Sequence, residues 1–520
     1  MRIVFDSRAS RIVSLFVAGA LAVPLGAQTP ARTAARSSEI PKAFDAIREA
    51  DIRHDVTEMA APGMRGREGG TLDELRASMW VADQYRRIGL QPMGDDGTYF
   101  QWFDMTRTRV SITSSRASIG GTVMSLFGDF IPYSVEPVEA SGAVLWVANA
   151  LDTTVDVRGR IVATPVLEPD PKTIRSTSYT FASRYSDAAI NGTARRFARR
   201  GATAILLVAN PAVDSAFRVV SDARERGSYD VDHAVPRAAN GSDRVAPPPT
   251  QGTGQTPAFL VHASMRETLM RQPQAQLEIR LERFTAPSVN IIGVVRGTDP
   301  KLRNEYVVFS SHQDANGVRS TLEGDSVHAG ADDNASVSAA LFASARAFVR
   351  QPGKRSVLFI HHGSEERGLL GSRYHAAHPV VPLSQIVAVL NGDMIGRNNP
   401  DSAALLGAQP PHRNSSDLVA MALRANSLTG RFKLDTLWDR PTHPEGWYFR
   451  SDHLPYARLN VPSLMYSTNL HDDYHTPRDR PDRIEYPKLT RMAQWMYLTG
   501  WFVANAPERP KLDAGFKLER

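Results

Sequence analysis

Residues 306–314 read YVVFSSHQD, an apolar run that passes directly into a histidine and an acid. Similar apolar runs occur at four other places in the second half of the chain: 290–295, 356–360, 386–390 and 463–466. Helical patterns lie between or after them, at 335–349, 417–428 and 486–504. Strands that alternate with helices predict an α/β sandwich, which places functional side chains just beyond the carboxyl ends of its strands.

Residues of metal-binding type stand at these positions. The quoted run ends in His312 and Asp314, and a turn with Asp333 precedes the predicted helix at 335–349. The remaining residues of this type follow the later predicted strands: Glu365, Glu366, Asp393 and His475. Because strand ends and turns from several parts of the chain converge in this kind of fold, the sequence predicts that these side chains form one site.

The composition restricts the chemistry of that site. The chain has 520 residues, 14 histidines and no cysteine. Thiol nucleophiles, disulfides, Cys-ligated zinc and iron–sulfur clusters are therefore excluded, and a bound metal must be held by His and carboxylate groups. The net charge of +6 is small for this length and is not gathered into a stripe, which argues against nucleic-acid binding.

The ordered motifs resemble those of the M28 family of metallopeptidases. The matching motifs, in the family's order, are H-x-D at His312, G-A-x-D-N at Gly330, E-E-x-G-L-x-G-S at Glu365, N-x-D-M-I-G at Asn391 and Y-H-T-P at Tyr474. The resemblance implies a three-layer α/β/α sandwich of the zinc-exopeptidase type with a mixed, largely parallel central sheet. It also implies a peptidase with two metal ions.

The resemblance assigns a role to each of the five expected ligands. It implies that Asp333 bridges two ions, with His312 and Asp393 completing one ion and Glu366 and His475 completing the other. An imidazole and carboxylates around each ion suit Zn²⁺, although Mn²⁺ or Co²⁺ accept the same donors. We therefore expect two Zn²⁺ ions as cofactors.

Five further residues are expected to serve the reaction. Neighbours on an extended segment point to opposite sides, so Glu365 can act as general base while the adjacent glutamate binds metal. The family resemblance implies that Asp314 fixes the His312 tautomer, that Tyr474 stabilises the oxyanion, and that Asp452 and His453 line the substrate pocket.

The middle of the chain differs in character from its two flanks. Residues 134–287 contain short β-like runs, one clear helix at 187–200 and a Gly- and Pro-rich stretch at 229–257 that predicts a long surface loop. Segments 156–162 and 198–205 resemble a protease-associated (PA) domain. We expect a discontinuous catalytic domain, residues 40–133 and 288–507, interrupted by a β-rich PA-like insert.

The N-terminus has the pattern of a secretory signal peptide. Arg2, Arg8 and Arg11 precede an apolar run at 12–23, which is too short for a comfortable membrane span, and small residues follow at Gly26 and Ala27. We expect residues 1–27 to be removed, leaving a protein without stable membrane insertion. The expected location is periplasmic or extracellular.

Together these features predict an exported aminopeptidase that acts on peptides. A carboxypeptidase or dipeptidase of the same family is an alternative, and so is a single-zinc glutaminyl cyclase. A receptor-like protein that keeps the fold without catalysis is the alternative from another class.

Overall fold

The computed structural model describes residues 38–170, 179–232, 234, 256–322 and 324–518. The expected signal peptide at 1–27 lies outside these residues. Among the helices in the described ranges, none combines the length and the apolar character that a membrane crossing requires. The description below concerns the compact unit that runs from Ile40 onward.

A mixed sheet of ten strands forms the larger half of this unit. In spatial order its strands are β19 (Lys433–Leu434), β18 (Ser402–Leu406), β20 (Ser463–Ser467), β17 (Ile386–Gly392), β13 (Tyr306–His312), β16 (Ser356–His362), β12 (Leu281–Val295), β2 (Phe100–Val110) and β9 (Ser228–Val231), with β1 (Gln91–Pro92) beside β12. The four central strands β20, β17, β13 and β16 run parallel, whereas the flanking pairs β12–β16, β2–β12 and β18–β20 are antiparallel.

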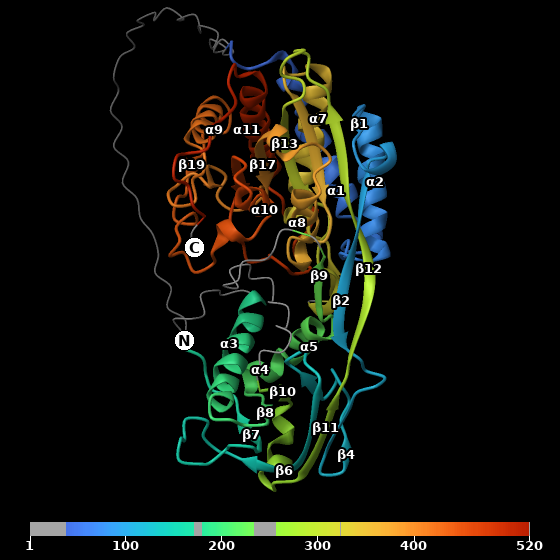
Figure 1. Cartoon of the computed structure of the whole chain (residues 1–520), viewed down its shortest axis with the longest axis vertical. Coiled ribbons are helices and arrows are strands. Elements are labelled where there is room, and N and C mark those ends of the chain that lie inside the picture. Colours follow the sequence, from blue (N-terminus) through green and yellow to red (C-terminus); the bar gives the residue numbers. More distant parts are fainter. Residues whose placement is uncertain (1–37, 171–178, 233, 235–255, 323, 519–520) are drawn as a thin grey trace, which may run out of the picture. The chain divides into compact units, whose positions relative to one another are not determined.

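Helices cover both faces of this sheet, as the strand residues require. Along β13, Val307 and Phe309 belong to one apolar cluster, while Val308 between them belongs to another on the opposite face. The first face packs against α1 (Glu49–Met59), α2 (Leu72–Ile88), α7 (Val337–Arg350), α9 (Ser416–Leu428) and α11 (Tyr486–Asn505). The second packs against α8 (Leu370–Ala377) and α10 (Leu454–Arg458). The expected three-layer α/β/α sandwich is confirmed (Figure 1).

Local signals in the sequence set the ends of these helices. Thr71 caps α2 by accepting a hydrogen bond from the backbone N–H of Asp73 at 3.2 Å. Gly89 ends the helix with φ of 98°, a conformation that costs a glycine little, and its N–H donates to the Tyr85 carbonyl. The buried side of α2 includes Glu74, whose carboxylate contributes to the site described below.

The segment between β2 and β12, residues 111–280, forms a second sheet and is called the inserted segment here. Its strands, in spatial order, are β4 (Thr122–Val123), β3 (Arg116–Ile119), β11 (Gln274–Ile279), β6 (Val138–Trp146), β7 (Ile161–Pro165), β8 (Ala204–Val208), β10 (Ala258–Val261) and β5 (Phe130–Pro132). Its helices are α3 (Tyr179–Ala198), α4 (Pro211–Ser215), α5 (Phe217–Glu225) and α6 (Arg266–Met270). The long β2–β12 pair leads from the large sheet toward it (Figure 1).

The inserted segment differs from expectation in three ways. It begins before residue 134, since β3, β4 and β5 already belong to its sheet, and these strands are too short to show an alternating pattern. It has helices at 211–215, 217–225 and 266–270 where the sequence indicated a single helix at 187–200. The predicted loop at 229–257 overlaps strand β9, whose pairing with β2 is a tertiary contact. Residues 235–255 of that loop lie outside the described residues.

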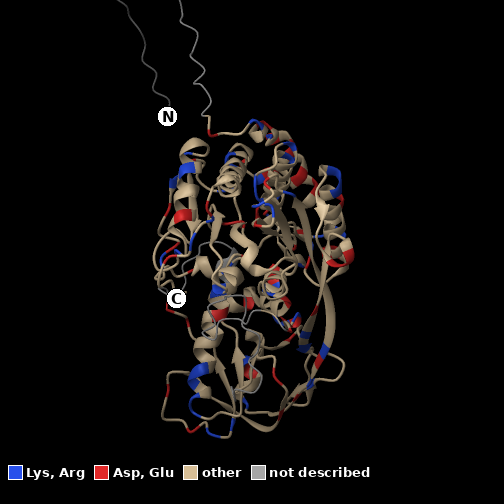
Figure 2. Ribbon diagram, turned by 45° about the horizontal axis from the view of Figure 1, so that its top comes forward, with Lys and Arg blue, Asp and Glu red and all other residues tan. Residues whose placement is uncertain are grey.

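Charged residues are spread through the described chain. Figure 2 shows basic and acidic segments interspersed over both the large sheet and the inserted segment. This distribution agrees with the small net charge of +6.

Candidate metal centre

The carboxyl ends of β13 and β17 place two of the expected ligands together. His312 is the last residue of β13, and Asp393 follows β17; their residues are 1% and 4% exposed. The Nδ1 atom of His312 lies 3.1 Å from the Asp314 carbonyl, so an Nδ1–H donates there and the Nε2 lone pair remains free. That Nε2 faces Asp333, with 3.2 Å to its Oδ1.

Asp314 contacts His312 mainly through its backbone carbonyl. Its carboxylate lies 3.6 Å from His312 Nδ1, which is beyond hydrogen-bond length, and the Asp314 carbonyl makes the contact instead. The carboxylate accepts hydrogen bonds from the backbone N–H groups of Glu365 at 2.9 Å and Glu366 at 3.2 Å. Asp314 therefore orients the imidazole through its backbone and the glutamate turn through its side chain.

A buried acid from α2 supports the same turn. Glu74 accepts hydrogen bonds from the Ser364 N–H at 2.8 Å and from the Ser288 hydroxyl at 2.9 Å. Burial, followed by the charge of Asp314, raises the pKa of Glu74 to about 8. The short turn that carries both glutamates, Glu365–Arg367, is thus held in place by Glu74, which is remote in the sequence.

Asp333 lies in the turn Ala331–Ser336 that leads into α7. The backbone N–H groups of Asp332 and Asp333 donate to the two carboxylate oxygens of Asp479, at 2.9 and 3.1 Å. The fully buried Arg67 donates to the Gly330 carbonyl at 2.9 Å and to the Gln313 carbonyl at 2.8 Å. These contacts hold the Asp333 turn against the end of β13.

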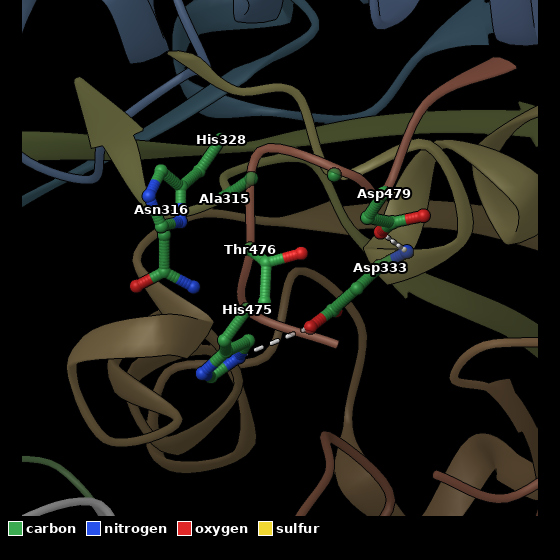
Figure 3. Close-up of a pocket in the computed structure, with 8 residues that line it drawn as sticks. Ala315, Asn316, His328, Asp333, His475, Thr476 and Asp479 are labelled. Carbon is green, nitrogen blue, oxygen red and sulfur yellow. Dashed lines mark hydrogen bonds and ion pairs between the residues drawn. The ribbon is translucent and has the colours of Figure 1, made fainter. Parts of the chain in front are cut away.

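On the other side of Asp333, His475 meets a second carboxylate. Its Nε2 lies 3.1 Å from Asp333 Oδ2 and 3.0 Å from Glu366 Oε2. Glu366 uses its other oxygen to accept a hydrogen bond from Asn316 at 2.8 Å. Figure 3 shows Asp333 between His475 and Asp479, with Asn316 and His328 lining the same small pocket.

Five side chains thus form two donor groups that share one residue. We call His312, Asp333 and Asp393 the inner donor group, and Asp333, Glu366 and His475 the outer donor group; within each, one donor atom per residue lies within 4.8 Å of the others. The Nε2 atoms of both histidines are buried and make no hydrogen bond. Free imidazole lone pairs facing carboxylates are the donors that zinc prefers.

Electrostatics in the described protein also favour cations at these positions. Burial and then the charge of Asp333 raise the pKa of Asp393 to about 8. Burial opposes the charged form of His475, yet the carboxylates of Glu366 and Asp333 raise its pKa to about 9. Carboxylates this close together need positive charge between them, which divalent ions would provide.

Glu365 lies beside the inner donor group without belonging to it. Its Oε2 atom is 3.7 Å from His312 Nε2, and the residue is 7% exposed. Burial raises the pKa of Glu365 well above its usual range, and the nearby charges of Asp393 and Asp452 add to this effect. A carboxylate with raised proton affinity that can still be reached from the site suits a general base.

Tyr474 occupies the edge of the outer donor group. Its ring stacks on the imidazole of His475 with centroids 3.6 Å apart. Its hydroxyl oxygen accepts a hydrogen bond from Arg450 Nη2 at 2.9 Å, so the phenol proton is free to be donated elsewhere. Arg450 also donates through Nη1 to Glu445 at 3.0 Å.

The expected pocket residues Asp452 and His453 are both fully buried and face different surroundings. Asp452 contributes to the raised pKa of Glu365 and Asp393, which places it near the inner donor group. His453 packs edge-on against the Tyr448 ring, with centroids 4.8 Å apart. The structure therefore brings Asp452 to the site and places His453 in an aromatic layer beside it.

Several residues of the site lie outside the sequence motifs from which the site was predicted. They are Arg67, Glu74, Asn316, Glu445, Arg450 and Asp479. Two had a positional signal, since Arg450 directly precedes the Ser451-Asp452-His453 motif and Asp479 follows Pro477 by two positions. Asn316 lies two positions after Asp314, and the remaining three act through hydrogen bonds to distant segments that no local pattern reveals.

A family model matches the part of the chain that carries both donor groups. Residues 290–499 match the family model described as peptidase family M28. Over these residues the family resemblance seen in the motifs is confirmed.

Two curated relatives agree with this assignment. Aminopeptidase YwaD of Bacillus subtilis (strain 168) is 25% identical over 253 residues, which cover 47% of this chain and 51% of the relative. A protein of Leptosphaeria maculans described as "Probable zinc metalloprotease" is 21% identical over 266 residues, 43% of this chain and 58% of the relative. The chain spans about half the length of the curated relatives it matches.

Solved structures share the fold over nearly the whole chain. An aminopeptidase from Aneurinibacillus sp. strain AM-1 aligns with a TM-score of 0.53 and 16% identity, covering 92% of this chain and 97% of that one. A zinc aminopeptidase from Bacillus subtilis aligns with a TM-score of 0.56 and 18% identity, covering 91% and 99%. At these identities the similarity concerns the fold.

Proposed function

We propose that this chain is an exported aminopeptidase that uses two divalent metal ions, with zinc the expected metal. The observation that carries the proposal is the pair of donor groups that share Asp333, with Glu365 beside them. The M28 domain and the aminopeptidase among its relatives support the reaction class, and the N-terminal sequence pattern supports export. A PA-like character of the inserted segment belongs to the same proposal.

The residues of the site divide the work of peptide hydrolysis among them. Ions held by the two donor groups would polarise the scissile carbonyl and lower the pKa of an attacking water. Glu365 accepts a proton from the water as its oxygen bonds to the carbonyl carbon. It then donates that proton to the amine nitrogen as the C–N bond breaks. The phenol of Tyr474 donates a hydrogen bond to the oxygen that becomes negative.

The charge balance around the site supports cleavage at the amino end of a peptide. The carboxyl groups of Glu365, Asp393 and Asp452 influence one another beside the donor groups, and burial raises the pKa of Asp452 to about 7 and that of Asp393 to about 8. A substrate ammonium close to these groups would favour their charged form and could be held by it. Arg450, by contrast, is already paired with Glu445, which makes it a poor receptor for a terminal carboxylate. This balance favours an aminopeptidase over a carboxypeptidase.

A panel of matched peptides tests the proposal. The purified, zinc-loaded protein should release the first residue of free peptides and of C-amidated peptides, and it should leave N-acetylated peptides intact. A chelator should stop the release, and added zinc should restore it. Cleavage of N-acetylated peptides together with resistance of C-amidated ones would favour the carboxypeptidase. A lack of cleavage throughout the panel would refute a peptidase role.

A further inference from the structure

An ion pair joins the inserted segment to a residue near the donor groups, on the part of the chain that forms the large sheet and its helices. Arg184, on α3, donates from Nη1 to Glu445 Oε1 at 2.5 Å and from Nη2 to Glu445 Oε2 at 2.8 Å. Two parallel bonds of this kind fix the plane of a guanidinium against the plane of a carboxylate. The pair is well shielded, since the side chain of Glu445 is 9% exposed and that of Arg184 is 31% exposed.

Glu445 passes this restraint to a second guanidinium. It accepts from Arg450 Nη1 at 3.0 Å while it is held by Arg184 on both oxygens. Arg450 lies over the ring of Trp447, with its Cζ atom 4.8 Å from the ring centroid. Its position is therefore set by one carboxylate and one aromatic face.

Arg450 in turn reaches the proposed oxyanion donor. Its Nη2 donates to the Tyr474 hydroxyl at 2.9 Å, and Tyr474 stacks on His475 of the outer donor group. Four side chains thus form an unbroken series of hydrogen bonds from α3 to the phenol. Each link has a charged partner, and such bonds are the stronger and more directional ones in proteins.

We propose that Arg184 is a positioning residue for catalysis, through which the inserted segment holds the Tyr474 phenol in place by way of Glu445 and Arg450. The proposal rests on the proposed function where it concerns turnover. By this proposal the inserted segment contributes to catalysis by positioning a side chain of the site. Without Arg184, Glu445 loses the two parallel hydrogen bonds that fix the plane of its carboxylate, and the bond from Arg450 to the phenol is then held less firmly.

An ion pair made by another residue of the range 111–280 supplies the control, on strand β9, which pairs with β2 of the large sheet. Arg373 on α8 pairs with Asp230 on β9 at 2.9 Å, and no hydrogen bond in the described residues connects this pair to Tyr474. Asp230→Asn removes an ion pair of the inserted segment without touching the series from Arg184. A general weakening of the contact would affect both variants equally.

The kinetic experiment compares Arg184→Met with Asp230→Asn on an amino-acid anilide. Arg184→Met should lower kcat about tenfold and change KM by less than about twofold, because a group that serves the transition state is displaced. Asp230→Asn should leave both constants unchanged. In a Tyr474→Phe background, Arg184→Met should have no further effect, since its target is gone. Additive losses of kcat in the double variant would overturn the proposal.

A spectroscopic experiment decides the point independently of activity. With 3-fluorotyrosine placed at position 474, the ¹⁹F resonance of metal-free protein should shift or broaden in Arg184→Met and stay unchanged in Asp230→Asn. An unchanged resonance in Arg184→Met would overturn the proposal. If the wild-type chain cleaves no peptide, the proposed function fails, and the ¹⁹F comparison still decides whether Arg184 positions Tyr474.

Discussion

The inner and outer donor groups share Asp333 but differ in how they are built. The inner group takes His312 and Asp393 from the ends of two adjacent parallel strands, and the His312 side chain is 1% exposed. The outer group takes Glu366 from a short turn and His475 from a loop, and the His475 side chain is 31% exposed. Strand ends thus support one group, whereas a turn and a more exposed loop residue support the other, which predicts unequal retention of metal.

The largest effect is expected from removing the residue that the two groups share. Asp333→Ala deprives each group of one of its three donors, so zinc content should fall from about two ions per chain to well below one, and turnover should fall by at least about 10⁴-fold. Metal analysis of dialysed protein and an anilide assay measure both. Retention of one tightly bound ion would show that the groups are independent.

Glu365→Gln should separate catalysis from metal binding. The amide cannot accept the proton of water, so kcat should fall about 10³-fold. The metal content of both donor groups should stay at the wild-type level, because Glu365 is outside each of them. Wild-type turnover in this variant would contradict the proposed base, and loss of metal would instead assign Glu365 to the inner group.

Chelation should remove the two ions in order. The outer ion, beside the more exposed His475, should dissociate first, and most activity should go with it. The inner ion should dissociate at a rate at least about tenfold lower. Stopped-flow detection of released zinc with a colorimetric chelator measures the two phases. A single phase for both ions would contradict the difference between the groups.

A smaller change should affect the outer group alone. Asn316 donates to Glu366 at 2.8 Å, and Asn316→Ala removes the partner that orients this carboxylate. Outer-ion affinity should fall about tenfold while the inner ion is unaffected. Asn398→Ala is the matched control, since Asn398 bonds to backbone carbonyls such as that of Thr468. Calorimetric zinc titration of the metal-free variants distinguishes them.

The smallest expected effect is on the pH dependence of stability and concerns β16, the strand beside β13 of the inner donor group. His361 is buried against Tyr85, with 2.7 Å between Nδ1 and the hydroxyl, and burial lowers its pKa from 6.5 to about 3. The folded state therefore holds this imidazole neutral, whereas the unfolded state binds a proton below pH 6.5. The stability that His361 contributes is present above that pH and is lost as pH falls toward 3.

His361→Asn keeps a polar partner for Tyr85 and cannot titrate in this range. Between pH 6.5 and 5 the wild type should therefore lose about 1 to 2 kcal/mol of unfolding free energy relative to the variant. Urea unfolding at several pH values provides the comparison. Parallel pH dependences for the two proteins would show that His361 is not held neutral.

Sequence reasoning reached the donor groups because their residues share a position that a pattern can reveal. His312 and Asp393 follow apolar strands, and Asp333 precedes a helix. The α/β alternation that predicted the sandwich was readable for the same reason. The chemical roles of these residues remain proposals, which the experiments above test.

The supporting residues and the inserted segment were not readable in this way. Glu74 and Arg67 reach the site from segments more than 200 positions away and bond to backbone groups, which leave no trace in local periodicity. The carboxylate of Asp314 turned to the glutamate backbone because two N–H donors there compete with one imidazole. Strands such as Thr122–Val123 are too short to carry a pattern.

The β2–β12 pair has an evolutionary consequence. Val110 and Leu281 lie opposite each other in this ladder, so the inserted segment leaves and re-enters the large sheet at adjacent points. A tight turn joining these two residues would close an ordinary hairpin, so a segment could be exchanged at this point, but a replacement would have to supply the partner that Arg184 gives to Glu445. Such a graft would have to bring its own β9, or leave the outer edge of β2 unpaired.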